Sequence, residues 1–263
     1  MTKGGTTIVS AFMANITKPK YLETNDNNRK YTEHFIPLFR ADVNKIIFID
    51  STVIDKYTSY ENHNTKLVPY VKETSYLYEY MPNLADFNPT TNNPEKDTIE
   101  FMFTMCNKTE WIKEAIRLNY FETNNFTWVD FGIRHIFGCT DEEFIKKIET
   151  IDEKTDEKTI DEKTDEKTDE KCVRIGTIWN LDNKYNIDIY KTIAWYFAGG
   201  VFGGNTTALL KFSDLMKEKC ISIMTNRNTI MWEVNIWYLI WCENKELFDV
   251  YKCDHNATLV DNY

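Results

Sequence analysis

The stretch Trp195-Tyr-Phe-Ala-Gly-Gly-Val-Phe-Gly-Gly-Asn205 holds four of the nine glycines of the chain within six residues. Glycine has no Cβ, so the backbone can take a positive φ or lie directly against a ligand. A strand-like run precedes the cluster and a helix-like run follows it, which predicts a strand–turn–helix corner. Such corners often form the floor of a site at the carboxyl edge of a sheet. The alternative is a packing corner without chemistry, because a motif taken without its context often misleads. The glycines are Gly199, Gly200, Gly203 and Gly204.

The composition excludes several classes of protein. The chain has 263 residues, 42% of them hydrophobic, and a formal net charge of −10. Nucleic acid is not an expected partner, because that affinity rests on Lys and Arg neutralising phosphates. No apolar run is long enough for a membrane span or a signal peptide. Six cysteines without a CxxC pair indicate reduced thiols. The sequence therefore predicts a cytoplasmic protein.

Short apolar runs alternate with helix-like segments along the chain. This alternation predicts an α/β fold with a mixed, mainly parallel sheet flanked by helices, in one domain over residues 1–263. The segment 99–105 fits either a strand or a helix. Strands are predicted over 6–12, 45–50, 67–71, 126–132, 173–179 and 248–251, and helices over 31–39, 109–118, 206–224 and 231–241.

Residues 150–171 form a low-complexity acidic insertion of five Thr-(Ile)-Asp-Glu-Lys units. Because this repeat has almost no apolar residues, burial cannot offset the entropy of ordering it. We expect a solvated insertion, disordered or weakly helical. The alternative is a charged arm that docks a partner.

Five polar residues are candidates for chemistry. Asp130 is predicted near the end of a buried strand, where an acid is costly unless a metal or another group pairs with it. His255 could complete an oxygen and nitrogen metal shell, or be a surface histidine. Glu233 begins a helix, where the dipole favours an acid in any case. Lys108 precedes a helix and could hold a phosphate there, or be exposed. Asp50 could contact a ribose hydroxyl or cap a loop.

Several of these segments resemble one known family. The chain is similar to the HtrL/YibB-type proteins, a glycosyltransferase-like family that also occurs in large DNA viruses. The resemblance rests on Ser10-Ala-Phe12, Asn107-Lys108, Phe126-Thr-Trp-Val-Asp-Phe-Gly132, Ala198-Gly-Gly-Val-Phe-Gly-Gly204 and Asp254-His255. Tyr196 to Gly204 with Trp232-Glu-Val-Asn235 also resembles the acceptor side of the ABO-type galactosyltransferases. These enzymes share the GT-A fold, a single Rossmann-like nucleotide-sugar domain.

The resemblance implies a nucleotide-diphosphate sugar as donor and a divalent metal, Mn²⁺ or Mg²⁺, as cofactor. Asp130 would stand where such enzymes keep the metal-binding acid of an Asp-x-Asp motif, although here the pattern is Asp-x-Gly. His255 would be the carboxy-terminal metal ligand. The bias towards Asn, Lys, Ile and Thr fits an AT-rich genome such as that of a giant virus. For a viral protein, the location would be the host cytoplasm or the virion.

The resemblance also implies the remaining roles. Glu233 would face the acceptor as a general base, or stabilise an oxocarbenium-like state. The Gly199–Gly204 segment would line the donor and acceptor sugars, and Ala11 and Phe12 would border the base. Lys108 would stabilise charge on the diphosphate, and the acceptor would be a glycan or a protein.

Two alternatives to an active transferase remain open. One is a nucleotide-sugar or glycan-binding protein on the same fold that has lost catalysis, which the absence of a second acid beside Asp130 would allow. The other is an interaction protein that uses the acidic repeat.

Overall fold

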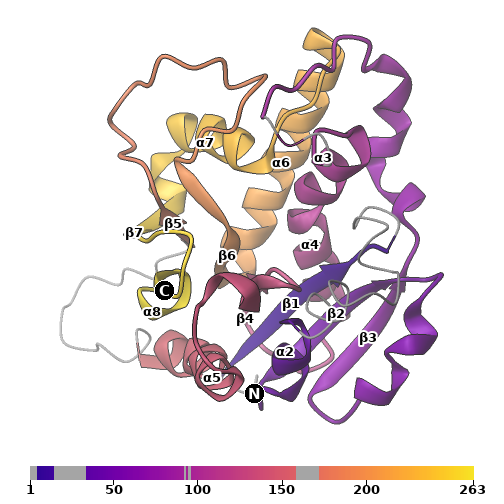
Figure 1. Ribbon diagram of the computed structural model, residues 1–263, viewed down its shortest axis with the longest axis vertical. Coiled ribbons are helices and arrows are strands. Elements are labelled where there is room, and N and C mark those ends of the chain that lie inside the picture. Colours follow the sequence, from indigo (N-terminus) through magenta and orange to yellow (C-terminus); the bar gives the residue numbers. More distant parts are fainter. Residues whose placement is uncertain (1–4, 15–33, 92, 94–95, 158–171) are drawn as a thin grey trace.

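One seven-stranded sheet forms the centre of the protein (Figure 1). The computed structural model describes residues 5–14, 34–91, 93, 96–157 and 172–263, and the side chains of 152–157 are not described. The strand order is β3-β2-β1-β4-β6-β5-β7. The strands are β1 (Thr6–Phe12), β2 (Asn44–Asp50), β3 (Thr65–Tyr70), β4 (Asn125–Val129), β5 (Val173–Thr177), β6 (Phe197–Asn205) and β7 (Phe248–Lys252).

The sheet is mixed and mainly parallel, as predicted. β1 runs parallel to β2 and β4, β2 to β3, and β5 to β7. β6 is antiparallel to both of its neighbours, β4 and β5. The first residues of β6 therefore lie beside the carboxyl end of β4, which brings two distant parts of the sequence to one edge of the sheet.

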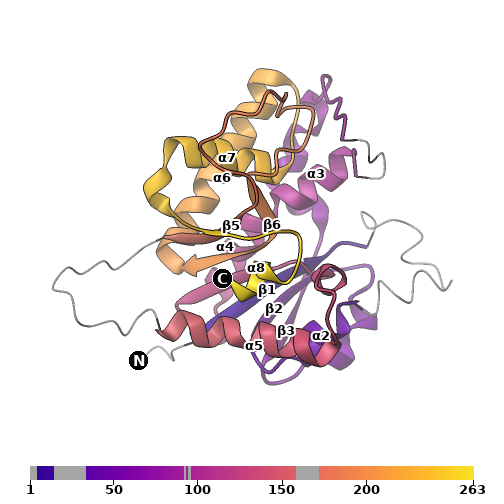
Figure 2. The same ribbon diagram turned by 60° about the vertical axis from the view of Figure 1, so that its left-hand side comes forward.

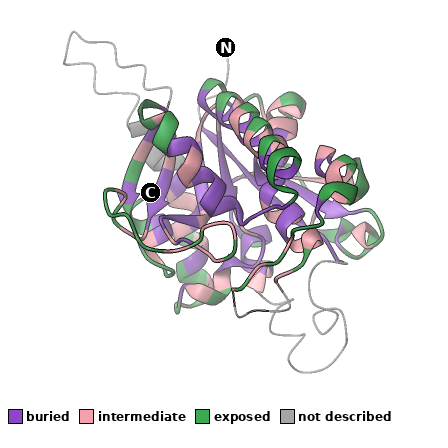
Figure 3. Cartoon of the chain, turned by 90° about the horizontal axis from the view of Figure 1, so that it is seen from above, coloured by how far each residue is buried: buried purple, intermediate pink, exposed green. Residues whose placement is uncertain are grey.

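Helices cover both faces of the sheet (Figures 1 and 2). Successive residues of β1 point to opposite faces, as in any strand. Val9 packs with residues of α3, α4, α6 and α7, whereas Ile8 packs with Phe144 and Ile148 of α5. Figure 3 shows the strands as a buried layer, with exposed residues on the outer sides of the helices. The helices are α2 (Ile36–Arg40), α3 (Ile99–Cys106), α4 (Lys108–Leu118), α5 (Asp141–Glu157), α6 (Thr206–Arg227), α7 (Glu233–Glu243) and α8 (Thr258–Asp261). Short 3-10 segments lie at Ile54–Lys56, Thr58–Tyr60, Lys72–Thr74, Tyr76–Asn83, Ile133–Ile136 and Lys245–Leu247.

Most predicted elements are found within a few residues of their expected ends. The ambiguous segment 99–105 is helix α3, and the Thr98 side chain caps it by accepting a hydrogen bond from the Phe101 amide at 3.2 Å. The helix predicted over 31–39 is the short α2, and residues 31–33 lie outside the described part of the chain. Asp130 follows the last residue of β4 directly.

The predicted glycine turn is wrong, because all four glycines lie inside β6. The chain changes direction at Asn205, whose side chain caps α6 by accepting a hydrogen bond from the Ala208 amide at 2.9 Å. Glycine is needed in the second half of β6 because the neighbouring strands approach closely. A Cβ on Gly203 would lie 2.5 Å from Thr127 Oγ1, and one on Gly204 would lie 2.5 Å from the Cys172 carbonyl oxygen.

The acidic insertion is helical where it begins. Residues 150–157 continue α5, and Ile151 is fully buried against the sheet face that Ile8 also faces. This part takes the helical one of the two expected states, with Ile151 as its apolar contact. The rest of the repeat, 158–171, lies outside the described residues.

None of the six cysteines is in a disulfide, in agreement with the sequence analysis. Within the described residues, no helix is both long enough and apolar enough to cross a membrane.

Candidate active site

A cavity of about 510 Å³ lies at the carboxyl ends of β1 and β4. Its lining includes Ala11 and Phe12 from β1 and Asp130 from the end of β4. Gly199 and Gly200 reach it because β6 runs against β4, and the Asp130 amide donates a 2.9 Å hydrogen bond to the Gly200 carbonyl. β1 pairs with β2 on one side and with β4 on the other, so the strand order changes direction at β1. Ligands of open α/β sheets bind at such points.

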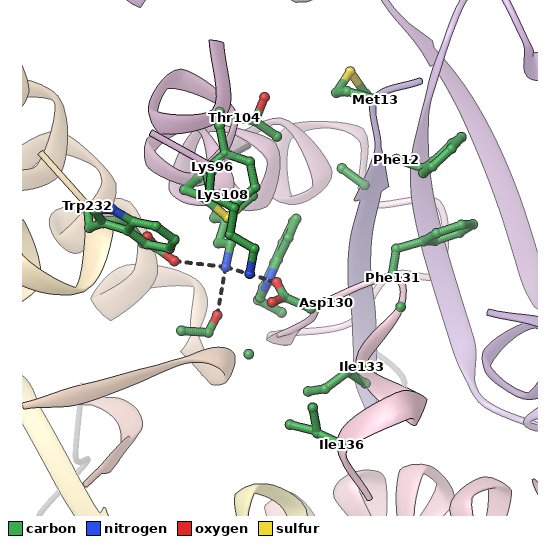
Figure 4. A pocket seen from close by; sticks show the side chains of 18 of the residues that line it. Phe12, Met13, Lys96, Thr104, Lys108, Asp130, Phe131, Ile133, Ile136 and Trp232 are labelled. Carbon is green, nitrogen blue, oxygen red and sulfur yellow. Dashed lines mark hydrogen bonds and ion pairs between the residues drawn. The ribbon is translucent and has the colours of Figure 1, made fainter. Parts of the chain in front are cut away.

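Lys108, the first residue of α4, is at the centre of the polar wall of this cavity (Figure 4). Its ammonium lies 2.9 Å from Asp130 Oδ1 and 3.0 Å from Glu233 Oε1. It also donates a 2.9 Å hydrogen bond to the Gly199 carbonyl. Since an ammonium has three N–H donors, these three acceptors use all of them.

The charge of Lys108 is fixed by its two carboxylates. The side chain is only 2% exposed. Burial by itself would lower the pKa of Lys108, but the charges of Asp130 and Glu233 and their hydrogen bonds outweigh it and raise the pKa to about 12. The ammonium is therefore a permanent part of the wall at neutral pH.

Two tryptophans fix the position of this group. Trp111 of α4 stacks on Trp128 of β4, with ring centroids 5.7 Å apart and an interplanar angle of 9°. The Trp128 ring lies 5.8 Å from the Lys108 ammonium. Trp128 Nε1 donates a 2.6 Å hydrogen bond to Asp130 Oδ1, so this oxygen is bound from two sides. Stacking of α4 on β4 thus orients both charges.

Glu233 is the buried acid of the site. It begins α7, and its side chain is 3% exposed. Oε1 accepts from Lys108, whereas Oε2 has no hydrogen-bond partner among the described residues. A buried carboxylate oxygen without a partner is costly, and functional sites are where such groups are kept. Gly199 is required beside it, because a Cβ there would lie 2.6 Å from Glu233 Oε1.

An aromatic cluster lies beside the β1 end of the cavity. Phe12 stacks on Phe131 at 5.2 Å, and Phe131 stacks on Phe35 at 4.7 Å. In Figure 4, Phe12 and Phe131 lie together, across β1 from Lys108 and Asp130. Ala11 and Phe12, which were predicted to border a base, both line the cavity.

The cavity lining also includes His255, Trp195, Trp232 and Lys96. The His255 ring lies edge-on to Trp195, with centroids 4.4 Å apart. Desolvation of this ring lowers the pKa of His255, Asp254 opposes that change, and the positive charge of Lys96 adds to it.

The predicted metal ligands Asp130 and His255 line the same cavity, but the described residues do not form a metal site by themselves. No group of three His, Cys, Asp or Glu side chains among them is arranged to hold a metal ion. Asp130 Oδ1 already accepts from Lys108 and Trp128, and the nearby ammonium disfavours a second cation. Mg²⁺ and Mn²⁺ sites at phosphates use one or two carboxylates, so a donor would have to supply most ligands here.

Three predicted binding residues are not in the cavity lining. Asp50 is buried and caps loops: Oδ1 accepts from the Thr52 amide and hydroxyl, and Oδ2 accepts from the Ala14 amide at 3.2 Å. This corresponds to its loop-capping interpretation. Gly203 and Gly204 lie in the part of β6 that pairs with the start of β4, and they serve strand packing.

The structure also revises the expected part of Lys108 and adds residues that the sequence did not suggest. Because all three N–H donors of Lys108 are used within the protein, it cannot bind a diphosphate without losing one of these bonds. Lys96 and the Trp128 indole were not expected at the site. Lys96 has no periodic signal in the sequence, whereas Trp128 lies two residues before Asp130, a spacing that places both side chains on one side of a strand.

The comparisons with solved structures found low-identity similarities over most of the chain. One is to 4-diphosphocytidyl-2C-methyl-D-erythritol synthase from Anaerococcus prevotii, with 9% identity, 95% of this chain and 88% of that chain covered, and a TM-score of 0.44. A second is to mouse xyloside xylosyltransferase 1 in its apo form, with 10% identity, 95% of this chain and 85% of that chain covered, and a TM-score of 0.45. A third is to a glycosyltransferase involved in glycosylation of the major capsid of PBCV-1, with 13% identity, 94% of this chain and 81% of that chain covered, and a TM-score of 0.39.

The sequence comparisons identify a family but no characterised relative. No curated protein sequence matches the chain. The sequence profile of a family described as "Bacterial protein of unknown function (HtrL_YibB)" matches residues 6–259. The resemblance noted on the sequence motifs is thereby confirmed over nearly the whole chain. This protein belongs to the HtrL_YibB family.

Proposed function

We propose that this protein is a glycosyltransferase that moves a sugar from a nucleotide-diphosphate donor to a hydroxyl group of an acceptor. The observation that carries the proposal is the pair of carboxylates, Asp130 and Glu233, bridged by the buried Lys108 on one wall of the cavity. The pair combines a half-exposed acid with a buried one. Acids in such different environments suit different roles in one reaction.

Glu233 is proposed as the general base. Oε1 is held by Lys108, and Oε2 has no partner among the described residues, so the carboxylate has capacity for a proton. The acceptor hydroxyl gives its proton to Glu233 as its oxygen forms a bond to the anomeric carbon. The bond from that carbon to the diphosphate breaks, and the nucleoside diphosphate leaves with the electron pair. In a retaining reaction the same carboxylate would stabilise an oxocarbenium-like state instead.

Asp130 is proposed to contact the donor. Its side chain is 37% exposed, and no hydrogen bond to its Oδ2 occurs among the described residues. The nucleoside would lie towards Ala11 and Phe12, and the transferred sugar would lie along Gly199 and Gly200, where the absence of side chains leaves room. If a divalent metal takes part, the donor phosphates would supply most of its ligands, with Asp130 and His255 as the protein donors.

A binding protein without catalysis is the second candidate, and one observation favours it. Two carboxylates line the described part of the cavity: Glu233 is almost fully buried, and Oδ1 of Asp130 is already occupied by Lys108 and Trp128. Such a site would bind a sugar nucleotide without developing the charge stabilisation that transfer requires.

A thermal-shift screen separates these candidates. The full chain is heated with each of a panel of nucleotide-diphosphate sugars, with and without Mn²⁺, and diphosphate release is measured in parallel. A transferase shows a raised melting temperature and release of nucleoside diphosphate, and Asp130→Ala loses the shift. A shift without release supports the binding protein. If no sugar nucleotide changes the melting temperature under either condition, both candidates are wrong.

A further inference from the structure

The cavity contains two lysine ammonium groups, Lys96 and Lys108, in very different electrostatic settings. An anionic part of a ligand in this cavity binds best to an ammonium whose N–H donors are not already used within the protein. The state of these two groups therefore decides where an anion binds.

Lys108 does not offer such a donor. Its three N–H groups are used by Asp130, Glu233 and the Gly199 carbonyl. With two carboxylates and one ammonium, the cluster carries a net charge of −1, which repels an approaching anion. Because Lys108 and Glu233 are shielded from water, this repulsion is stronger than it would be at the surface.

Lys96 is arranged differently. It is partly exposed, and its ammonium lies 5.7 Å from the centre of the Phe101 ring and 6.0 Å from that of Trp232. No ion pair of Lys96 occurs among the described residues, and its only described hydrogen bond is made by its backbone amide. The aromatic faces orient the ammonium but leave its N–H donors available.

The surroundings of Lys96 favour an anion. Trp232, which the Lys96 ammonium approaches, packs beside Trp195, and the His255 ring meets Trp195 edge-on with centroids 4.4 Å apart. The rings of Phe101, Trp195 and Trp232 give this wall an apolar surface, since Trp195 and Trp232 lie 6.4 Å apart and Phe101 and Trp232 lie 5.2 Å apart. A charge-assisted hydrogen bond is stronger where water is excluded.

We propose that Lys96, held against the rings of Phe101 and Trp232, forms an anion-binding subsite of the cavity. In the proposed transfer reaction, its ligand would be either the diphosphate of the donor or a carboxylate of an acidic acceptor sugar. Both present oxygen anions to the same ammonium. Only the choice between these two ligands rests on the proposed function. The test of the subsite measures binding and needs no turnover.

The test is calorimetric titration of the full-length wild-type chain with inorganic pyrophosphate and with D-glucuronate, at low ionic strength and pH 7.5. At least one anion should bind the wild type, and Lys96→Met should weaken that binding at least about tenfold, because a charged hydrogen bond is lost. Lys96→Arg should retain most of it. Lys113→Met is the matched control, since that exposed lysine pairs with Asp214 outside this cavity and should leave the affinity unchanged.

The two probes also identify the source of the anion. Binding of pyrophosphate assigns the subsite to the donor, and binding of glucuronate without pyrophosphate assigns it to an acidic acceptor. The subsite is refuted if neither anion binds the wild type, or if Lys96→Met binds as well as the wild type. If Lys96→Met transfers sugar with unchanged kinetics, the subsite is wrong and the proposed function still stands. If the wild type binds an anion but transfers no sugar, the subsite stands and the proposed function is wrong.

Discussion

Replacing Lys108 with methionine tests the bridged pair of acids most severely. The variant keeps an unbranched side chain of similar length but removes the ammonium and its three hydrogen bonds. Asp130 is 37% exposed, so water can partly replace its lost partner. Glu233 is 3% exposed and would be left as a buried charge without a counter-ion. Breaking a buried ion pair from one side costs about 3–5 kcal/mol.

We expect Lys108→Met to lower the free energy of unfolding by that amount at pH 7, as measured by urea denaturation followed by tryptophan fluorescence. Adding Glu233→Gln to the variant should restore part of the loss, because the unpaired charge is then absent. The double-mutant cycle should show a coupling of about 1–3 kcal/mol between the two residues.

Lys113→Met is the control for removing a lysine from the same helix. Its ammonium is exposed and pairs with an exposed Asp214 carboxylate. Such a pair contributes less than about 1 kcal/mol. The reasoning is refuted if Lys108→Met is no less stable than Lys113→Met, or if the cycle with Glu233→Gln shows no coupling.

Two further substitutions test separate parts of the structure. Gly199→Ala should lose the thermal shift given by sugar nucleotides, because its Cβ would lie 2.6 Å from Glu233 Oε1 and displace the acid. Gly138→Ala is the control, since nothing lies within 4 Å of its Cβ and only the positive φ of 60° is strained, and it should keep the shift. Equal effects of the two substitutions would contradict the argument. Lys45 is fully buried, and desolvation lowers its pKa to about 8 despite Asp42 and Glu149. Because the unfolded chain then binds the Lys45 proton more tightly, the free energy of unfolding of the wild type should rise by about 2 kcal/mol between pH 7 and 9.5 relative to Lys45→Met; parallel pH profiles from urea denaturation would show that Lys45 is not desolvated.

The fold was largely predictable because its signals are local. The β-branched run of β1 and the apolar stripe of α4 report their own burial, and the structure places both as expected. The β6 glycines were misread because their need for space comes from β4 and β5, not from a turn in the local chain. A glycine cluster alone does not distinguish a turn from a strand under close contact.

The site was only partly predictable for the same reason. The sequence offers Asp130, Glu233 and His255 as separate candidates, and all three line one cavity. Their proposed chemical roles stay predictions. The saturation of Lys108 depends on three acceptors from three distant segments, so no spacing rule could have shown it. Lys96 reaches Trp232 through tertiary packing, which likewise leaves no periodic pattern in the sequence.

Transfer itself is the most direct measurement of the central claim. The full-length wild type and Glu233→Gln are each incubated with a sugar nucleotide that raises the melting temperature, and release of nucleoside diphosphate is followed over time. We predict release by the wild type and a loss of about 100-fold or more in Glu233→Gln, the usual size of general-base catalysis, with binding of the sugar nucleotide retained. Equal rates in the two proteins, or release by neither while the nucleotide binds, would contradict the account of Glu233 as the base of a sugar-transfer site.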